Sequence, residues 1–322
     1  MKTLTVIVIL SAVFVVSGVC ADWVFEGKWG STGSGNGQFR APWGMGVASN
    51  GNVYVVDVLN SRVQYFTPTG SYLGKWGVNG SGDGEFDAPH GITVAPNGNV
   101  YVVDSENDRV QYFTATGSFL GKWGTRGTGN GGFHYPMGIA VAANGDVYVA
   151  DCFNDCVQYF TANGSFLGQW GTSGPGNGQF DEVADVTVAD NGYVYAVDVW
   201  NYRIQYFTAT GSFVGKWGSY GSGEGQFRFP SGITAGPNNY IYVTQTSYTR
   251  IQYFTSVGSY LGRWGSSGSG NGEFNYPRGI CFSPSGSRIY VADMDNDRVQ
   301  YFYYNTSGIK PASVGKVKAL FH

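Results

Sequence analysis

Aspartate and arginine recur at fixed intervals along the chain, and such pairs of opposite charge are the first candidates for chemistry. Five aspartates share one position of a repeating pattern, and four of them are followed five residues later by an arginine. The aspartates are Asp57, Asp104, Asp151, Asp198 and Asp293, and the arginines are Arg62, Arg109, Arg203 and Arg298. A catalyst needs one asymmetric constellation of groups. A pair that recurs in every repeat instead ties together the two ends of one turn, so we interpret these pairs as structural.

Glycine-rich stretches such as residues 30–37 raise the possibility of phosphate binding. A phosphate-binding loop opens a helix and carries a lysine followed by serine or threonine. Neither feature is present here. We therefore interpret these stretches as connectors between repeats.

Histidine, the commonest metal ligand and general base, is scarce: the chain has His90, His134 and the terminal His322. His90 and His134 lie in consecutive connectors, and Asp87 and Asp181 share the repeat position of His134. Their spacing matches no strong ligand signature. We predict no catalytic residue, no metal site and no cofactor, and a metal held by these side chains stays open as an alternative.

Cys152 and Cys156 lie across one turn, because Cys152 follows Asp151 and Cys156 takes the place of the recurrent arginine in its repeat. In an exported protein we expect these two cysteines to form a disulfide that replaces the lost ion pair. So small a loop would add only about 2 kcal/mol of stability. Cys281 falls on a first strand, where we expect a buried free thiol.

All these residues are positioned by one repeat. The motif Gly-Lys-Trp-Gly, or a close variant of it, returns every 47 residues, beginning at Gly27, Gly74, Gly121, Gly168, Gly215 and Gly262. A fixed period of this length is the sign of a repeat architecture. The tryptophan of each copy is expected to pack in the same way.

Each repeat predicts four short strands. In the second repeat they cover residues 91–95, 100–104, 109–114 and 118–123, and Asn97-Gly98 supplies a tight turn after the first strand. Strands that are apolar on both faces suit blades stacked face to face around an axis. The sequence therefore predicts an all-β fold, a six-bladed β-propeller of four-stranded antiparallel blades.

The sixth repeat ends after its third strand, and residues 23–29 match the missing fourth strand. We expect this N-terminal strand to close the last blade. The recurring motifs Gly-x-Phe-x-x-Pro-x-Gly-Ile and Val-Tyr-Val-x-Asp-x-x-Asn-x-Arg-Val-Gln-Tyr-Phe resemble the NHL repeat, and the resemblance covers residues 23–304. It implies a six-bladed propeller in which the connectors between blades and the turns between second and third strands share one face.

The two ends of the chain lie outside this pattern. Residues 1–21 have the features of a signal peptide, with an apolar run from Leu4 to Val19, and we expect cleavage after Ala21. An uncleaved anchor and a lipid on Cys20 are the alternatives. The propeller is assigned to residues 22–304 and a loose C-terminal tail to residues 305–322. We expect a secreted protein or one on the extracellular surface.

Comparison of the repeats with one another shows where they differ. The turns between third and fourth strands hardly change, whereas two positions near the opposite face vary strongly. After the connector proline the residues are Trp43, His90, Met137, Ala184, Ser231 and Arg278; after the second strand they are Leu59, Glu106, Phe153, Trp200, Ser247 and Asp295. A regular scaffold with an asymmetric rim is typical of a recognition surface. We predict a binding site made of Trp43, His90, Met137, Arg278, Phe153 and Trp200.

The favoured function is a non-catalytic extracellular scaffold that binds a protein or glycan partner through this face. Nucleic acid is excluded as a partner because the net charge of the chain is −3, without the basic surplus that phosphate contacts need. One alternative is a metal-dependent propeller enzyme, similar to amidating lyases or to another lyase or hydrolase. The other is a structural component of a cell surface or matrix. The sequence predicts neither the identity of the partner nor the oligomeric state.

Overall fold

The computed structural model describes residues 23–305. The predicted signal peptide and almost all of the predicted C-terminal tail lie outside these residues. Within them, no helix is long and apolar enough to cross a membrane.

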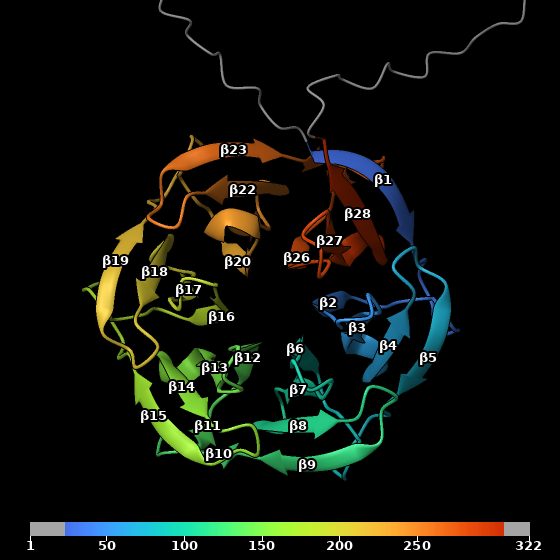
Figure 1. Cartoon of the computed structure of the whole chain (residues 1–322), viewed down its shortest axis with the longest axis horizontal. Helices are drawn as coiled ribbons and strands as arrows, with labels where there is room; N and C mark the ends of the chain where they lie inside the picture. Colours follow the sequence, from blue (N-terminus) through green and yellow to red (C-terminus); the bar gives the residue numbers. More distant parts are fainter. Residues whose placement is uncertain (1–22, 306–322) are drawn as a thin grey trace, which may run out of the picture.

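Six four-stranded antiparallel sheets are arranged as blades around a central axis, as Figure 1 shows. Blade 1 contains β2 (Pro42–Val47), β3 (Val53–Asp57), β4 (Arg62–Phe66) and β5 (Tyr72–Trp76). Blade 2 contains β6 (Pro89–Val94), β7 (Val100–Asp104), β8 (Arg109–Phe113) and β9 (Phe119–Trp123). Blade 3 contains β12 (Pro136–Val141), β13 (Val147–Asp151), β14 (Cys156–Phe160) and β15 (Phe166–Trp170).

The second half of the ring repeats this order. Blade 4 contains β16 (Val183–Val188), β17 (Val194–Asp198), β18 (Arg203–Phe207) and β19 (Phe213–Trp217). Blade 5 contains β20 (Pro230–Ala235), β21 (Ile241–Gln245), β22 (Arg250–Phe254) and β23 (Tyr260–Trp264). Blade 6 contains β26 (Pro277–Phe282), β27 (Arg288–Asp293), β28 (Arg298–Tyr304) and β1 (Trp23–Trp29).

Short elements decorate the connectors and turns. Two parallel pairs of two-residue strands lie in connectors: β10 (Thr125–Arg126) with β11 (Gly132–Phe133), and β24 (Ser266–Ser267) with β25 (Glu273–Phe274). Four 3-10 turns complete the described elements: η1 (Val58–Asn60), η2 (Cys152–Asn154), η3 (Pro237–Asn239) and η4 (Met294–Asn296).

The N-terminal strand closes the ring, as the sequence predicts. β1 pairs antiparallel with β28, from Trp23 opposite Tyr304 to Trp29 opposite Val299. Figure 1 shows the first and last parts of the described chain side by side in this blade. Trp23 is buried there and packs edge to face on Tyr242 of blade 5. The outermost strand of the last blade therefore also holds the neighbouring blade.

Contacts between blades repeat with the sequence period. Trp29 of blade 6 packs over Gly70, which lies in the turn between β4 and β5 of blade 1. A Cβ on Gly70 would come within 2.6 Å of the Trp29 ring. Gly70 also has φ +90°, which favours glycine. The hydroxyl of Tyr54 donates a hydrogen bond to the carbonyl of Ala115 in blade 2, and Tyr101 bonds Ala162 of blade 3 in the same way. The conserved positions of the repeat thus hold each blade to its neighbour.

The Asp–Arg pairs are structural, as the sequence indicates. The Arg62 Nε donates to Asp57 Oδ2 at 2.7 Å, and the other pairs have the same geometry at 2.6 Å: Asp104–Arg109, Asp198–Arg203 and Asp293–Arg298. All four carboxylates are fully buried. Each arginine also binds the glycine-rich connector, and Arg62 donates to the carbonyls of Ser34, Gly35 and Gln38. One ion pair therefore fixes both a turn and the path of a connector.

The expected disulfide in blade 3 is wrong, because Cys152 and Cys156 are free, buried thiols. The Cys156 thiol faces Asp151, with its Sγ 3.8 Å from Oδ2, so it occupies the beginning of the path that arginine follows elsewhere. Cys152 instead lines the cavity described below. Their spacing across one turn brings the backbones together but sends the two side chains to different surroundings. Cys281 is a buried free thiol, as predicted.

Blade 5 has lost the aspartate but kept the arginine. Gln245 stands in the aspartate position, and its Nε2 and the Nε of Arg250 are both buried without hydrogen-bond partners. Arg250 still reaches the connector carbonyls of Gly223 and Gln226, but at 3.2 and 3.3 Å. An unpaired buried donor costs free energy. This blade is therefore the least well satisfied of those that carry the arginine.

We predict that Gln245→Asp raises the free energy of unfolding by about 1–3 kcal/mol, because it supplies the missing acceptor to Arg250. The matched reverse change in blade 4, Asp198→Gln, should lower it by about 3–5 kcal/mol by leaving Arg203 unpaired. Urea unfolding followed by tryptophan fluorescence measures both. A stability loss in Gln245→Asp would contradict the proposed role of the pair.

Candidate functional site

A cavity of about 500 Å³ lies at the axis on the connector face of the ring. Residues from all six blades form its wall, including Trp43, His90, Met137, Trp200 and Arg278. Its volume lies within the range of ligand pockets in proteins. All six residues that the comparison of repeats predicts as a binding site line this one cavity, because Phe153 is also in the wall.

Two kinds of loop bring these residues together. The positions after the connector prolines begin the inner strands, and the turns after the second strands lean against the same connectors. The Phe153 N–H donates to the carbonyl of His134 at 3.1 Å, and the Trp200 N–H donates to that of Asp181 at the same distance. Connectors and second turns therefore share one face, as the resemblance implies.

The predicted residues differ in depth. Phe153 and Trp200 are 48% and 43% exposed at the rim, whereas His90 is only 4% exposed. His90 packs edge to face on Trp43, with ring centroids 4.5 Å apart, and against Tyr135 at 5.5 Å. His90 is thus buried and supports the rings of Trp43 and Tyr135, and the aromatic side chains at the rim are the accessible part of the site.

The residues immediately before the inner strands, which precede the connector proline or, in blade 4, Val183, were not among those predicted. Tyr135, Glu182, Phe229 and Tyr276 occupy this position and line the cavity. All of them have positive φ, between 52° and 58°. The N–H of Tyr135 is held by Asp108 Oδ1 at 2.7 Å, which stabilises this unusual backbone. The variation at this position is visible in the sequence, because the first two repeats have Ala41 and Ala88 there.

The rings of the wall contact one another. Phe153 stacks on Tyr135 with centroids 5.1 Å apart, and Trp200 meets Phe229 edge to face at 4.8 Å. The Arg278 guanidinium lies over the Trp43 ring, 3.9 Å from its centroid. Such contacts hold aromatic side chains in defined positions. The wall is therefore preorganised.

Burial lowers the pKa of His90 to about 4, so its imidazole is neutral at neutral pH. The Ser105 hydroxyl donates to the carbonyl of Pro136 at 2.6 Å and lies 2.9 Å from the Nδ1 of His90. Since that hydroxyl has one proton, Nδ1 must carry the imidazole proton. Arg278 differs, because burial lowers its pKa only to about 10 and it stays charged. At neutral pH the cavity wall therefore carries the positive charge of Arg278, and His90 is uncharged.

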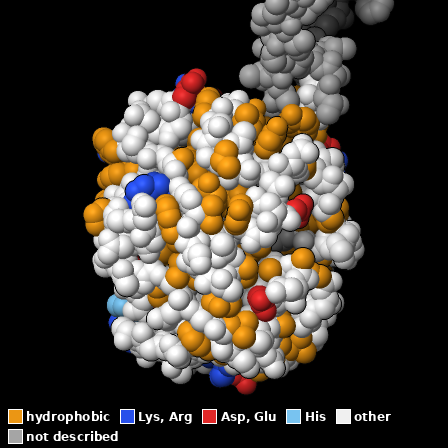
Figure 2. All heavy atoms as spheres, turned by 60° about the vertical axis from the view of Figure 1, so that its left-hand side comes forward, with side chains coloured by type: hydrophobic (Ala, Val, Ile, Leu, Met, Phe, Trp, Pro, Cys, Tyr) orange, Lys and Arg blue, Asp and Glu red, His pale blue; other side chains and the backbone are white. Residues whose placement is uncertain are grey.

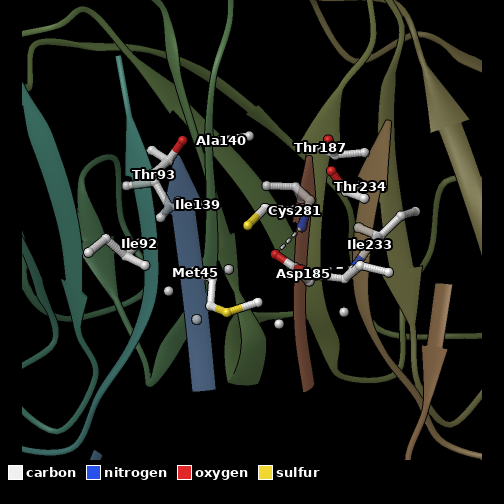
Figure 3. Close-up of a pocket in the computed structure, with 18 of the residues that line it drawn as sticks. Met45, Ile92, Thr93, Ile139, Ala140, Asp185, Thr187, Ile233, Thr234 and Cys281 are labelled. Carbon is white, nitrogen blue, oxygen red and sulfur yellow. Dashed lines mark hydrogen bonds between the residues drawn. The ribbon is translucent and has the colours of Figure 1, made fainter. Parts of the chain in front are cut away.

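Below the cavity, the inner strands enclose a narrower channel of about 270 Å³, shown in Figure 3. Five blades have glycine at one position of the channel wall, because a Cβ there would clash with the next blade. A Cβ on Gly44, for example, would come within 2.2 Å of the His90 carbonyl oxygen. Blade 4 has Asp185, which accepts the N–H groups of Val186 at 2.9 Å and Ile233 at 3.0 Å. Burial raises the pKa of Asp185 to about 7. This carboxyl group fills the seam between blades 4 and 5.

In the part of the chain that the structure describes, no three His, Cys, Asp or Glu side chains are placed to hold a metal together. His134 does not join His90, because its Nε2 lies 3.1 Å from an Arg126 nitrogen and its ring packs on Phe153. Of the two connector histidines, only His90 reaches the cavity wall.

Exposed apolar side chains also occur away from the cavity. Figure 2 shows hydrophobic groups interspersed with uncharged atoms on one side of the ring, with few charged side chains. On the outer strands Leu73, Leu120 and Leu167 are each 44% exposed. These leucines repeat from blade to blade, whereas the cavity combines different residues from each blade. Asymmetry, not apolar exposure, distinguishes the candidate site.

The comparisons with known proteins agree with this architecture. The NHL repeat family matches residues 39–66, 86–113 and 133–160, each running from a connector into the third strand of blades 1 to 3. No curated protein sequence matches the chain.

Several solved structures have a similar fold. Virginiamycin B lyase from Staphylococcus aureus has 16% identity and a TM-score of 0.60, with 88% of this chain and all of that chain covered. A gluconolactonase from Xanthomonas campestris has 14% identity and a TM-score of 0.61, covering 89% and 98%. A Bacteroides thetaiotaomicron protein of unknown function has 15% identity and a TM-score of 0.67, covering 88% and 76%. At such identities the likeness shows the fold alone.

We predict that the His90 imidazole titrates near pH 4. Its folded pKa lies below the ordinary value of 6.5, so its contribution to stability falls as the pH drops from about 6.5 to 4. Between pH 7 and pH 5 the loss is about 2 kcal/mol. NMR of the histidine side chains gives the midpoint, with His90→Gln assigning the signal and removing this part of the pH dependence in urea unfolding. A midpoint near 6.5 would show that the ring is hydrated.

Proposed function

We propose that this chain, a six-bladed β-propeller of NHL repeats, is a binding scaffold that captures a protein or glycan partner in the cavity on its connector face. One observation carries the proposal. All six variable positions after the connector prolines, and three of the six after the second strands, line one cavity, while the positions that agree build the ring. A recognition site needs both a rigid support and a specific surface.

The arrangement of the wall supports binding. Phe153 and Trp200 are large apolar side chains at the rim, and Trp43 and Met137 lie deeper in the wall. Aromatic and arginine side chains that lose contact with water on association supply most of the energy of typical interfaces. Their mutual contacts limit the side-chain freedom that binding would otherwise remove. The cavity therefore has the features of a preformed binding site.

The proposed setting is extracellular. This part of the proposal rests on the leader-like sequence of residues 1–21. A partner is therefore to be sought among exported proteins or surface glycans. Detection of the chain in the extracellular fraction, beginning at Asp22, would support it.

We predict that replacing Trp43, Phe153 and Trp200 together with serine weakens partner binding by about 30-fold or more. The partner is first captured from the native extracellular fraction by the unmodified chain, and its affinity is then measured for both proteins. The matched control changes Leu73, Leu120 and Leu167 to serine, three exposed apolar residues on the outer strands. Equal affinity of the triple cavity variant and the unmodified chain, with both folded, would refute the proposed site.

A further inference from the structure

Arg278 is a charged group held in the cavity wall without a counter-ion. Its Nε is buried and has no hydrogen-bond partner. No carboxylate of the described residues forms an ion pair with it; Asp295 acts on it only at longer range. Four buried arginines of the described residues are paired with aspartates, as Arg298 is in the same blade, and Arg250 is the exception. Arg278 is thus ready to accept an anionic partner.

The position of the guanidinium favours a carboxylate. Its plane carries N–H groups along the edges, which match the two oxygens of a carboxylate. Its contact with the Trp43 ring occupies one face and supports the charge. An anionic ligand can therefore approach from the edge while Trp43 keeps the arginine in place.

Three polar side chains of the wall are already engaged. The Ser231 hydroxyl contacts Thr244 Oγ1 at 3.0 Å and the Pro277 carbonyl at 3.2 Å, and the Thr246 hydroxyl donates to the Phe229 carbonyl. His90 uses its Nδ1 for Ser105. A sugar, which carries many hydroxyls, would gain little from these three groups. An apolar body with one anionic group fits better.

The aromatic rings also argue against a sugar. Arg278 covers one face of Trp43 and Tyr135 covers one face of Phe153, which leaves fewer aromatic faces for stacking on a sugar ring. His90 meets Trp43 edge to face. The rings thus form an apolar wall whose rim stays accessible, which suits an inserted side chain.

The cavity also limits the shape of its ligand. All six blades contribute to the wall, and several wall residues, Trp43, Met137 and Arg278 among them, also line the channel beneath. A ligand in the cavity therefore lies at the axis, above the smaller channel. This geometry suits a small molecule or the end of a chain.

We infer that the cavity binds an apolar or aromatic carboxylate, whose apolar body contacts Met137 and the rim rings while its carboxylate pairs with Arg278. This inference rests on the proposed binding function and names its ligand chemistry. Two sources share that chemistry: a free aromatic acid and the C-terminal residue of a peptide. In both, the apolar group lies close to the carboxylate.

Isothermal titration of the full chain tests the inference with matched probes. 3-Phenylpropionate is compared with its amide, and a short peptide ending in phenylalanine is compared with the same peptide amidated at its C-terminus. We expect each acid to bind about 10-fold or more tightly than its amide. Tighter binding of the peptide acid than of 3-phenylpropionate identifies a peptide end as the source, and the reverse order identifies a small acid. Either order supports the inference.

Two variants locate the effect. Arg278→Gln should abolish the preference for acid over amide, and Asp295→Asn should increase the affinity for both acids several-fold, because it removes a negative charge near Arg278. Arg278→Lys should retain part of the preference. The acid and amide comparison on the unmodified chain stays decisive if a variant does not fold.

Equal binding of acids and amides, no binding of any probe, or tighter binding of glucuronate than of 3-phenylpropionate would overturn the inference. These results leave the proposed function testable by itself. If the captured partner still depends on Trp43, Phe153 and Trp200, the scaffold function stands and the ligand chemistry is wrong.

Discussion

The buried contact between aspartate and arginine is the interaction on which the rest of the ring depends. In four blades the carboxylate pairs with the guanidinium, and the guanidinium also donates to carbonyls of the connector. The connectors are rich in glycine and would otherwise have many conformations. Fixing them also fixes where the next inner strand begins. The ion pairs therefore help to position the cavity wall, although they do not line the cavity.

Glycine imposes a second constraint at the axis. The inner strands approach so closely that five blades exclude a Cβ at one position, as Gly279 shows beside the carbonyl of Trp43 at 2.3 Å. Blade 4 satisfies the same seam differently, since the Asp185 carboxyl group accepts two backbone N–H groups. The ring thus tolerates one polar insertion where the hydrogen bonds compensate for burial.

The sequence was sufficient to predict features that recur in every repeat. The period of 47 residues predicted the blades, the match of residues 23–29 predicted the closing strand, and the fixed Asp–Arg spacing predicted the ion pairs. Features that depend on contacts with the neighbouring blade were harder to predict from the sequence. The depth of His90 follows from its packing against Trp43 and Tyr135 of adjacent blades, and sequence spacing carries no such information. The predicted disulfide failed because closeness in sequence does not determine the direction of a side chain.

Closure of blade 6 by β1 has a consequence for the order of events during synthesis. Trp23 emerges from the ribosome near the beginning, but its partner Tyr304 is among the last described residues to be made. Blades 1 to 5 each come from one continuous segment and can form as the chain lengthens. The first strand must stay unpaired until the others have emerged. β1 is therefore the first strand of the propeller to be synthesised and the last to pair.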